Sequence, residues 1–426
     1  MKKVLVVSYL YYPSTEVGAR RIYNLRKFLK DEEIDVTILT VDFTRYAELD
    51  ESLDYHGEKV FRTPSFGPVK VTKRVMNESF AVGFTRRAAY LLKRLCSQIL
   101  FPDEYIGWRP FAVAKGIRLH KEEKFDYVLA TGRPWSDFII GRAIARKCKI
   151  PIILDYRDPW TADENIFFPS AFIKKISHWY EQRLVRYVDK IIVNTEAVKE
   201  LFLKHFRHNL EGKIFVVTNG YDPQTAEHLE KASVDRGDHT GQGMCRLIHT
   251  GSFFESRSLE TLIQAMRQLH EEKVIHPDNF EILSYGPLLG KDKRLLQQFN
   301  LTAFVKEHSF IPYFDSLKML CKSSMNLLIV GNGHGSMIPA KLFDYLLARR
   351  PIFCVGPEIS EAGKIIKAHD YGFYARINDP KDIAVRLRDA IHLYRQGKMQ
   401  EPLTVPDQYS IRNQVHRLAV LLKGGL

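Results

Sequence analysis

The sequence predicts an α/β protein built from two Rossmann-like, doubly wound parallel sheets. Apolar segments of strand length alternate with segments of helical periodicity through both halves of the chain, an order typical of parallel sheets covered by helices. The 426 residues are too many for one ordinary core, and 45% hydrophobic with 27% charged residues indicate a globular protein. We therefore expect two domains.

In the first half, strands are expected at residues 4–8, 36–40, 127–130, 151–156 and 190–194. Helices are expected at 18–30, 137–147 and 174–187. Within the first helix Ile22, Leu25, Phe28 and Leu29 recur at helical spacing, which gives the helix one buried face.

In the second half, strands are expected at residues 246–250, 280–284, 326–330 and 351–355. Helices are expected at 258–269, 293–299, 314–321, 339–348 and 381–394, with Ser258 as the N-cap of the first. A last helix at about 411–422 is expected to pack back on the first domain.

Residues 222–243 are polar and lack periodicity, so they are the expected linker. The predicted domains are an N-terminal domain at 1–221, with 408–426 packing on it, and a C-terminal domain at 244–407. Two such sheets joined once would face a cleft at the carboxyl ends of their strands, where ligands bind in open α/β sheets.

The segment GNGHGSMIPAKLFDYLLARR, residues 331–350, carries the clearest ligand signal. A glycine-rich loop runs from an apolar strand into a helix, and such a loop lets an anion approach the main chain at the positive end of the helix. Asp344 lies about one and a half turns into the following helix, where its carboxylate could reach ribose hydroxyls of the same ligand. The alternative is a surface loop before an ordinary helix in which Lys341 and Asp344 form an ion pair. The candidate donor-binding residues here are Gly333, His334, Gly335, Ser336, Lys341 and Asp344.

Arg257 lies in the loop that Gly251 opens after the first strand of the second half. An arginine is always charged and can grip a phosphate with two N–H groups, so it could neutralise a leaving diphosphate. The alternative is an ordinary surface arginine. In the first half, Gly18 and Arg20 follow the first strand in a similar strand, loop and helix arrangement.

The segment DYRDPWT places Asp155, Asp158 and Trp160 at the end of a strand, where an acid could position or deprotonate an acceptor hydroxyl and an aromatic ring could stack on a sugar or a lipid. Asp-Pro is also common turn chemistry. Arg133 and Trp135 lie at the end of the preceding strand. We expect Asp155, Asp158 and Arg257 to be catalytic and Arg20, Arg133, Trp135 and Trp160 to contact an acceptor, so the N-terminal domain is the expected acceptor-binding domain. Gly251 and Arg257 are further candidate donor-binding residues of the C-terminal domain, which is expected to bind a nucleotide sugar.

The net charge of +13 is partly concentrated at residues 70–94, a basic and partly amphipathic segment. Such a segment suits the anionic inner face of a membrane, although a solvated helix face is an equal alternative. Nucleic acid is not expected, because no nucleic-acid-binding signature occurs. Five scattered cysteines and the absence of an 18-residue apolar run predict a cytoplasmic protein with reduced thiols.

No P-loop, zinc motif or Asp-x-Asp pair occurs in the sequence, so no metal and no cofactor are expected. Charge on a bound diphosphate would then be neutralised by arginine, lysine and helix ends.

Taken in order, several segments resemble glycosyltransferase family 4, the retaining sugar-nucleotide transferases with the GT-B fold, and look most like members that act on bacterial surface polysaccharides. They are YYPSTEVGARR, FPDEYIGW, DYRDPWT, VNTEAVKELF, VTNGYD, HTGSFFESRSLETLIQA, FIPYFDSL and IPAKLFDYLLARRPIF. The resemblance implies that Arg257 and Gly18 contact the donor diphosphate and that Asp344 holds the ribose. The first acid of the family's pair falls on Ser336, where this chain departs from the pattern.

The sequence therefore predicts a retaining, metal-independent hexosyltransferase that uses a nucleotide diphosphate sugar, with UDP as the expected nucleotide, in bacterial polysaccharide biosynthesis. The expected acceptor is lipid-linked or a glycan, and a peripheral position at the inner membrane surface is expected. Two alternatives stay open: a catalytically degenerate GT-B protein that binds sugar nucleotide or scaffolds a glycan-assembly complex, and a GT-B epimerase.

Overall fold

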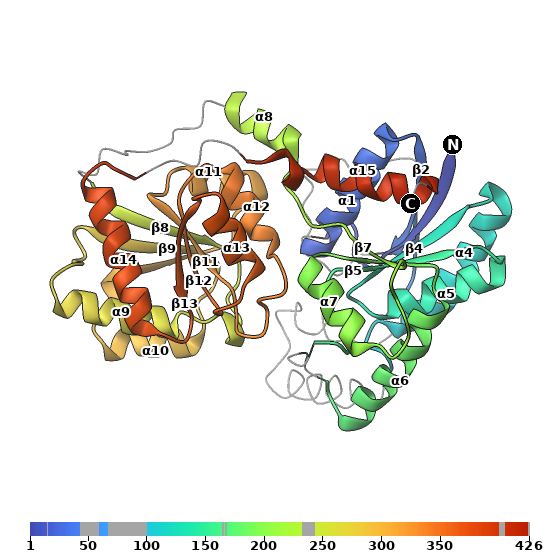
Figure 1. Ribbon diagram of the computed structural model, residues 1–426, viewed down its shortest axis with the longest axis horizontal. Coiled ribbons are helices and arrows are strands. Elements are labelled where there is room, and N and C mark those ends of the chain that lie inside the picture. Colours follow the sequence, from blue (N-terminus) through green and yellow to red (C-terminus); the bar gives the residue numbers. More distant parts are fainter. Residues whose placement is uncertain are drawn as a thin grey trace, which may run out of the picture. The chain divides into compact units, whose positions relative to one another are not determined.

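The computed structural model describes residues 1–14, 16–42, 59–66, 100–163, 166, 168–231, 243–399 and 405–424. The chain forms two compact units, each with its own sheet and core (Figure 1). Unit 1 comprises Met1–Thr218 and Ile411–Leu426, and unit 2 comprises Asn219–Ser410. The basic segment 70–94 and Cys96 lie outside the described residues.

Unit 1 contains a seven-stranded sheet in which every strand pair is parallel. Its order is β3 (Val60–Thr63), β2 (Ile34–Val41), β1 (Lys2–Val7), β4 (Tyr127–Gly132), β5 (Ile152–Tyr156), β6 (Lys190–Val193) and β7 (Ile214–Val216). The helices are α1 (Val17–Asp31), α4 (Arg109–Glu123), α5 (Ser136–Cys148), α6 (Ala171–Tyr187), α7 (Glu196–His205) and α15 (Ile411–Lys423), with a 3₁₀ turn at Ile106–Trp108.

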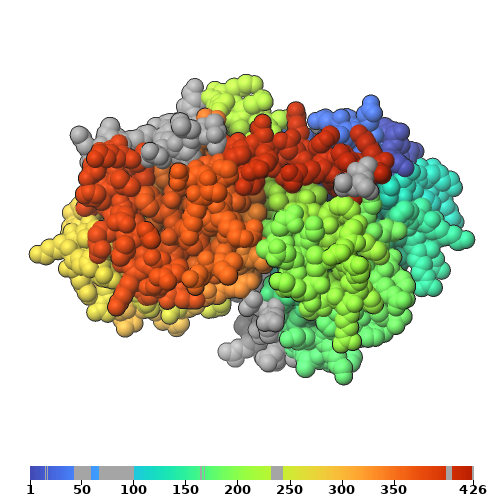
Figure 2. Space-filling view, in the orientation of Figure 1, coloured from blue at the N-terminus to red at the C-terminus, as the bar shows by residue number. Residues whose placement is uncertain are grey.

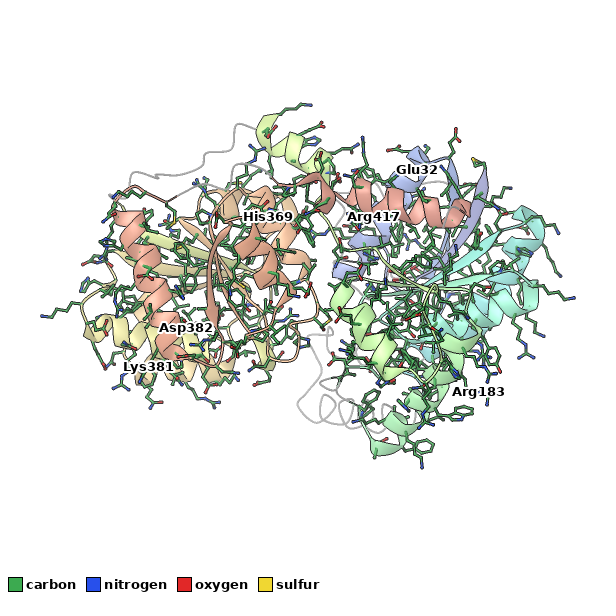
Figure 3. All side chains as sticks on the ribbon, viewed as in Figure 1. Glu32, Arg183, His369, Lys381, Asp382 and Arg417 are labelled. Carbon is green, nitrogen blue, oxygen red and sulfur yellow. The ribbon has the colours of Figure 1, made fainter. Side chains whose placement is uncertain are left out.

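The C-terminal helix α15 belongs to unit 1 and packs against α1 and the sheet. His416 Nδ1 lies 2.8 Å from Glu32 Oε1, and Lys190 Nζ donates to the Leu421 carbonyl oxygen at 2.9 Å. Figure 2 shows α15, in red, on the surface beside the blue N-terminal residues, and Figure 3 shows Glu32 beside it. The two ends of the chain therefore share one core.

Unit 2 contains a six-stranded, wholly parallel sheet in the order β10 (Val305–His308), β9 (Phe280–Tyr285), β8 (Cys245–Thr250), β11 (Met325–Ile329), β12 (Ile352–Gly356) and β13 (Gly372–Arg376). The helices are α8 (Pro223–Lys231), α9 (Glu260–Glu271), α10 (Gly290–Gln298), α11 (Tyr313–Cys321), α12 (Ala340–Leu347), α13 (Glu361–Ala368) and α14 (Pro380–Arg395). Short 3₁₀ turns lie at Glu255–Arg257, Thr302–Phe304 and Asp407–Tyr409.

The predicted class of two doubly wound parallel sheets is confirmed. Two local expectations are wrong. The segment 222–243, which was expected to be a linker, contains the amphipathic helix α8. Leu229 of this helix is buried, although the composition of the segment is mostly polar. Helix α9 begins at Glu260 and not at Ser258, because the 3₁₀ turn Glu255–Arg257 occupies the preceding residues.

Each sheet has a point at which its strand order reverses. In unit 1 this point lies between β1 and β4, and in unit 2 it lies between β8 and β11. Loops that leave adjacent strands in opposite directions separate there, so the carboxyl ends of these strands are the usual ligand sites of such sheets. Among the helices of the described residues, none is both long and apolar enough to cross a membrane.

Candidate functional site

In unit 2, the loops that follow β8 and β11 touch at the switch point. A Cβ added to Gly331 would lie 2.4 Å from the Ser256 carbonyl oxygen, so only glycine permits this approach. Gly251 begins the β8 loop with φ of +96° and donates its N–H to the Tyr285 carbonyl oxygen at 2.8 Å. The close approach and the positive φ explain why glycine occupies both positions.

Lys341, in the first turn of α12, extends toward the end of β8. Its Nζ lies 3.2 Å from His249 Nε2, and a Cβ on Gly251 would lie 2.9 Å from the same nitrogen. His249 Nδ1 lies 3.0 Å from the Leu327 carbonyl oxygen and must carry the proton, because a carbonyl oxygen only accepts. His249 Nε2 is therefore the acceptor for Lys341.

The electrostatic environment of this pair is unusual. Burial, together with the charge of Lys341, holds the pKa of His249 well below its usual range, so the imidazole is neutral. Burial and the neighbouring charge of Arg257 lower the pKa of Lys341 to about 7, while Asp344 opposes this effect. An anion placed here would relieve the repulsion between Lys341 and Arg257.

Arg257 ends the 3₁₀ turn after β8 and is partly buried. Its backbone N–H donates to the Phe254 carbonyl oxygen at 2.7 Å, which closes the turn. The structure thus brings Gly251, Arg257 and Lys341, three of the predicted donor-binding residues, to one place.

Asp344 is partly buried on α12, and its Oδ1 accepts a hydrogen bond of 2.8 Å from the Tyr313 hydroxyl at the start of α11. The hydroxyl fixes one carboxylate oxygen and orients the group. Tyr345 on the same helix donates to the Leu327 carbonyl oxygen at 3.1 Å, so α12 is tied to β11 and its side chains are held in register.

The glycine-rich loop 331–336 has different roles along its length. Gly333 has φ of +79° and is exposed, whereas a Cβ on Gly335 would lie 2.1 Å from the Ile359 carbonyl oxygen. Gly335 is therefore required by packing against the segment before α13. His334 and Ser336 are partly exposed beside them, and the His334 N–H donates to the Gly331 carbonyl oxygen at 3.1 Å.

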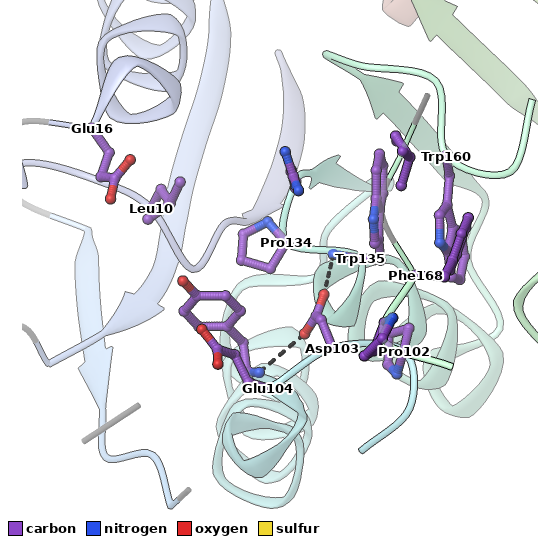
Figure 4. Close-up of a pocket in the computed structure, with 13 residues that line it drawn as sticks. Leu10, Glu16, Pro102, Asp103, Glu104, Pro134, Trp135, Trp160 and Phe168 are labelled. Carbon is purple, nitrogen blue, oxygen red and sulfur yellow. Dashed lines mark hydrogen bonds between the residues drawn. The ribbon is translucent and has the colours of Figure 1, made fainter. Parts of the chain in front are cut away.

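In unit 1, a pocket of about 420 Å³ lies at the switch point between β1 and β4 (Figure 4). Four segments line it: the loop after β1, residues 102–105, residues 133–135 after β4, and the segment before α6. The volume lies within the range of small-molecule sites. Arg133, Trp135 and Trp160, three of the predicted acceptor residues, line this pocket, and Arg20 on α1 does not.

Asp103 shapes one side of the pocket. Its Oδ2 accepts from the Trp135 N–H at 2.6 Å, and its Oδ1 accepts from the Tyr105 N–H at 3.0 Å (Figure 4). The same Oδ2 also accepts from the Ser136 N–H at 3.1 Å. The Ser136 hydroxyl also donates to it. Asp103 thus caps the N-terminus of α5 from outside the helix and fixes the 133–135 loop.

Two tryptophans form the aromatic wall of the pocket. The rings of Trp135 and Trp160 stack with centroids 5.3 Å apart and planes 10° apart, and Phe168 lies at the same end of the pocket (Figure 4). Trp160 is fully buried and Trp135 is 4% exposed. The expectation that Trp160 presents its face to an acceptor is therefore wrong for this conformation, since the ring supports the wall.

Charged groups also line the pocket. Glu16 and Arg133 are exposed and Glu104 is partly buried. The pocket thus combines an apolar aromatic wall with carboxylates and one guanidinium. This combination suits a ligand with an apolar face and several hydroxyl groups.

Asp155, predicted to be catalytic, is fully buried at the end of β5. Arg21 Nη2 donates to its Oδ1 at 2.7 Å, while Arg21 Nε and the Thr131 hydroxyl donate to its Oδ2 at 3.0 and 2.9 Å. Arg21 also donates to the Val217 and Thr218 carbonyl oxygens. Because both oxygens are engaged, Asp155 joins β4, β5 and α1 and is a positioning group; the expected catalytic role is not compatible with this geometry.

Asp158 is partly exposed beside Arg157, whose guanidinium packs on Gly18. Arg157 Nε donates to the Gly132 carbonyl oxygen at 3.1 Å, and a Cβ on Gly18 would lie 1.3 Å from Arg157 Nη1. Burial lowers the pKa of Arg157, and the carboxylates of Asp158 and Asp155 counter this effect. Gly18 therefore makes room for a guanidinium at the start of α1.

Sequence reasoning missed four groups that organise these sites: Arg21, Asp103, His249 and Tyr313. Each of Arg21, Asp103 and Tyr313 has a partner more than 30 positions away along the chain: Asp155, Trp135 and Asp344 respectively. His249 had one usable signal, because it stands two positions before a glycine at the carboxyl end of the central strand.

Known proteins resemble this chain in part of its sequence and in its fold. The family model of Glycosyltransferase Family 4 matches residues 18–225. A comparison with curated protein sequences finds no match.

Three solved structures have a similar fold. A TarM mutant from S. aureus in complex with Fondaparinux, alpha-GlcNAc-glycerol and UDP is 12% identical with a TM-score of 0.63, covering 99% of this chain and 100% of that one. WaaG, a glycosyltransferase involved in lipopolysaccharide biosynthesis, is 13% identical with a TM-score of 0.59 and the same coverage. The UDP-GlcNAc 2-epimerase from Methanocaldococcus jannaschii is 12% identical with a TM-score of 0.53, covering 100% of both chains.

The family model covers almost all of unit 1 between α1 and α8, and the solved structures span both units. Residues 18–225 of this chain therefore match the family model of glycosyltransferase family 4, and both units have the fold of the GT-B glycosyltransferases.

Proposed function

We propose that this protein transfers a hexose from a nucleoside diphosphate sugar, with UDP as the nucleotide, to a hydroxyl of a glycan or lipid-linked acceptor in bacterial polysaccharide biosynthesis. Unit 2 binds the donor and unit 1 binds the acceptor. The observation that carries the proposal is the cluster of Lys341, Arg257 and Gly251 at the switch point of unit 2.

The chemistry of that cluster matches a diphosphate beside a ribose. Arg257 and Lys341 supply two cations, and their proximity is unfavourable until an anion is bound. Asp344, oriented by the Tyr313 hydroxyl, is the carboxylate that we propose contacts the hydroxyls of the ribose. Ser336 occupies the position of the first acid of the family's pair. We therefore propose that His334 and the loop backbone contact the donor sugar instead of an acid.

We propose a retaining transfer without a metal. The bond between the anomeric carbon and the donor phosphate breaks, and the acceptor oxygen forms a new bond on the same face of the sugar. The acceptor proton moves to an oxygen of the leaving diphosphate. Arg257 and Lys341 stabilise the charge that develops on this diphosphate, which is the principal catalytic contribution of the protein.

For the acceptor, the proposal rests on the pocket of unit 1. Glu16, Glu104 and Arg133 can hydrogen-bond sugar hydroxyls, and Trp135 forms the apolar wall. Asp158, which is partly exposed and lies two positions before Trp160 in the chain, is proposed to orient the acceptor. WaaG and TarM, which share the fold, are consistent with an acceptor of this class.

A thermal-shift panel with UDP, GDP, ADP, CMP and NAD tests the donor site. A ligand at about one hundred times its Kd stabilises the folded state by about 2.7 kcal/mol, so the selected nucleotide is recognised by its rise in Tm. Arg257→Ala should weaken diphosphate binding by roughly 10- to 100-fold and leave the bare nucleoside unchanged, because the lost contact is to phosphate. Asp344→Ala should weaken both.

Arg267→Ala is the matched control, because Arg267 is an exposed arginine of the same unit paired with Glu271 at 2.8 Å. Equal loss of nucleoside and diphosphate affinity in Arg257→Ala would contradict its phosphate role. No shift with any nucleotide would contradict the donor site as a whole.

An epimerase is the second candidate, because the epimerase from M. jannaschii has the same fold over both chains. An epimerase converts the donor sugar without an acceptor, whereas a transferase releases nucleotide only when acceptor is present. Incubation with the donor alone, followed by analysis of the sugar, separates the two. Binding without any turnover would favour the degenerate GT-B protein, for which Ser336 is the motivating residue.

A further inference from the structure

The outer face of α6 carries three of the most exposed large aromatic side chains of the described residues. Phe172 is 68% exposed, Trp179 is 56% exposed and Tyr187 is 56% exposed. Leaving three large aromatic rings in water on one helix is unfavourable, since burying such a side chain contributes about 1.5–3 kcal/mol. A cluster of this kind marks an interaction surface.

The same face is strongly basic. Lys175, Arg183 and Arg186 are exposed on it. Within α6, all of which the structure describes, the one carboxylate is Glu181, and it is fully buried on the opposite face. Figure 3 shows Arg183 directed away from the core of unit 1.

Aromatic rings and cations are interleaved along the helix and not separated into two faces. At 3.6 residues per turn Phe172, Lys175, Trp179, Arg183 and Arg186 fall on one stripe, while Ile173, Ser177, Leu184 and Val185 fall on the buried side. Arg183 Cζ lies 5.1 Å from the centre of the Trp179 ring, and Arg186 Cζ lies 5.5 Å from that of Tyr187. Cations that lie over exposed rings can reach an anionic headgroup while the rings enter the interface.

The inner side of the same helix supports the acceptor pocket. Tyr180 packs on Phe101 with ring centroids 5.3 Å apart and on Trp160 at 6.5 Å, and Trp160 belongs to the pocket wall. Phe168 and Pro169, which line the pocket, come directly before the N-cap Ser170 of α6. The aromatic and basic face is thus continuous with one edge of that pocket.

We propose that the outer face of α6 docks unit 1 on an anionic phospholipid surface. Trp and Tyr favour the interfacial region of a bilayer, and each lysine or arginine near an anionic leaflet strengthens binding about fivefold. The cations of this face would contact the phosphate headgroups, and the aromatic rings between them would enter the apolar layer below. The residues of this surface belong to α6 and not to the sequence segment 70–94, and the docking proposed here does not depend on transferase activity.

Trp179 provides a direct probe of this docking. All four tryptophans of the chain fall within the described residues, and Trp108, Trp135 and Trp160 are 0%, 4% and 0% exposed. A change in the emission of water-exposed tryptophan therefore reports on Trp179. With vesicles of equimolar phosphatidylcholine and phosphatidylglycerol, the emission should move to shorter wavelength, and Trp179→Phe should bind but lose this shift.

Sedimentation with the same vesicles measures the partition coefficient. Arg183→Glu with Arg186→Glu should lower it by at least about 25-fold, and Phe172→Ala with Trp179→Ala by at least about tenfold. The charge control is Arg294→Glu with Lys398→Glu, two exposed cations of unit 2, and the aromatic control is Phe310→Ala, whose side chain is 56% exposed. Both controls should bind as the wild type does.

Salt should weaken binding of the wild type, and phosphatidylcholine vesicles should bind far less. Binding that survives both α6 variants, equal losses in the α6 and control variants, or an unchanged Trp179 emission would each overturn the proposal. The nucleotide shifts of the α6 variants should equal those of the wild type. A failure of lipid docking is therefore distinguishable from a failure of the donor site.

Discussion

His249 Nε2 lies 3.2 Å from Lys341 Nζ, although 92 positions separate the two residues in the chain. The imidazole is fixed by its bond to the Leu327 carbonyl oxygen, so it accepts a hydrogen bond from the lysine and leaves the other N–H groups of the amine for a ligand. The hydrogen bond to His249 holds the amine in place, while the charges of Arg257 and Asp344 act on its pKa in opposite directions. This arrangement makes the protonation of Lys341 sensitive to a bound anion.

Binding of the donor should depend on pH through Lys341. Its pKa of about 7 in the free protein will be raised by a bound diphosphate, so binding above pH 7 requires uptake of a proton. Affinity for the nucleotide sugar should be constant below about pH 7 and should fall by up to about tenfold per unit above it. Isothermal titration calorimetry in buffers of different ionisation enthalpy measures both the affinity and the proton uptake.

Lys341→Arg is the control for this dependence, because arginine stays charged through the whole range. The variant should bind with a flat pH profile and no proton uptake. If it kept the pH dependence of the wild type, another group would be responsible.

Gly251→Ala should abolish diphosphate binding with only moderate loss of stability. The added methyl group would lie 2.9 Å from Lys341 Nζ, and φ of +96° strains any residue other than glycine by about 1–3 kcal/mol. Gly212→Ala is matched to it, since Gly212 has φ of +77° but no atom within 4 Å of the added group. Both variants should lose similar stability, and a comparable loss of UDP binding in Gly212→Ala would show that the effect is not local.

Asp155→Asn should destabilise the protein by about 3–5 kcal/mol, because Arg21 would then be buried without its countercharge. Urea unfolding followed by circular dichroism measures the change. If the variant were as stable as the wild type but had no turnover, Asp155 would have a catalytic role and not a positioning one.

Because of Glu181, the free energy of unfolding should fall as the pH rises from about 4.5 to about 7. Burial raises the pKa of Glu181 to about 7. Hydrogen bonds from the Thr161 N–H and hydroxyl favour the carboxylate and reduce this rise. The folded state therefore holds a proton that the unfolded state has released, and the stability linked to it, on the order of 3 kcal/mol, is lost as pH rises through this interval.

Glu181→Gln tests this linkage, because the amide mimics the protonated acid. Relative to the wild type, the variant should gain stability as pH rises from 5 to 8 in urea unfolding experiments. Parallel curves for the two proteins would mean that Glu181 is ionised in the folded state at all these values.

Much of the fold could be predicted from the sequence because hydrophobic periodicity is a local property. The expected strands at 4–8, 127–130 and 326–330 overlap β1, β4 and β11, and the glycine-rich loop before α12 lies where the sequence placed it. Helix α8 was missed because its nine residues carry few apolar side chains. The start of α9 was misplaced because a 3₁₀ turn follows β8, and Ser258 resembled an N-cap.

The sequence by itself determined the alternation of strands and helices, the glycines that allow close approach, and the charged residues at the ends of strands, since each depends on neighbours along the chain. The tertiary structure alone decided the pairings of Arg21 with Asp155, of His249 with Lys341, and of Asp103 with the start of α5. The order of strands in each sheet brings these residues together across long stretches of chain. Burial then separates groups that position others, such as Asp155, from groups that remain available to a ligand, such as Arg133.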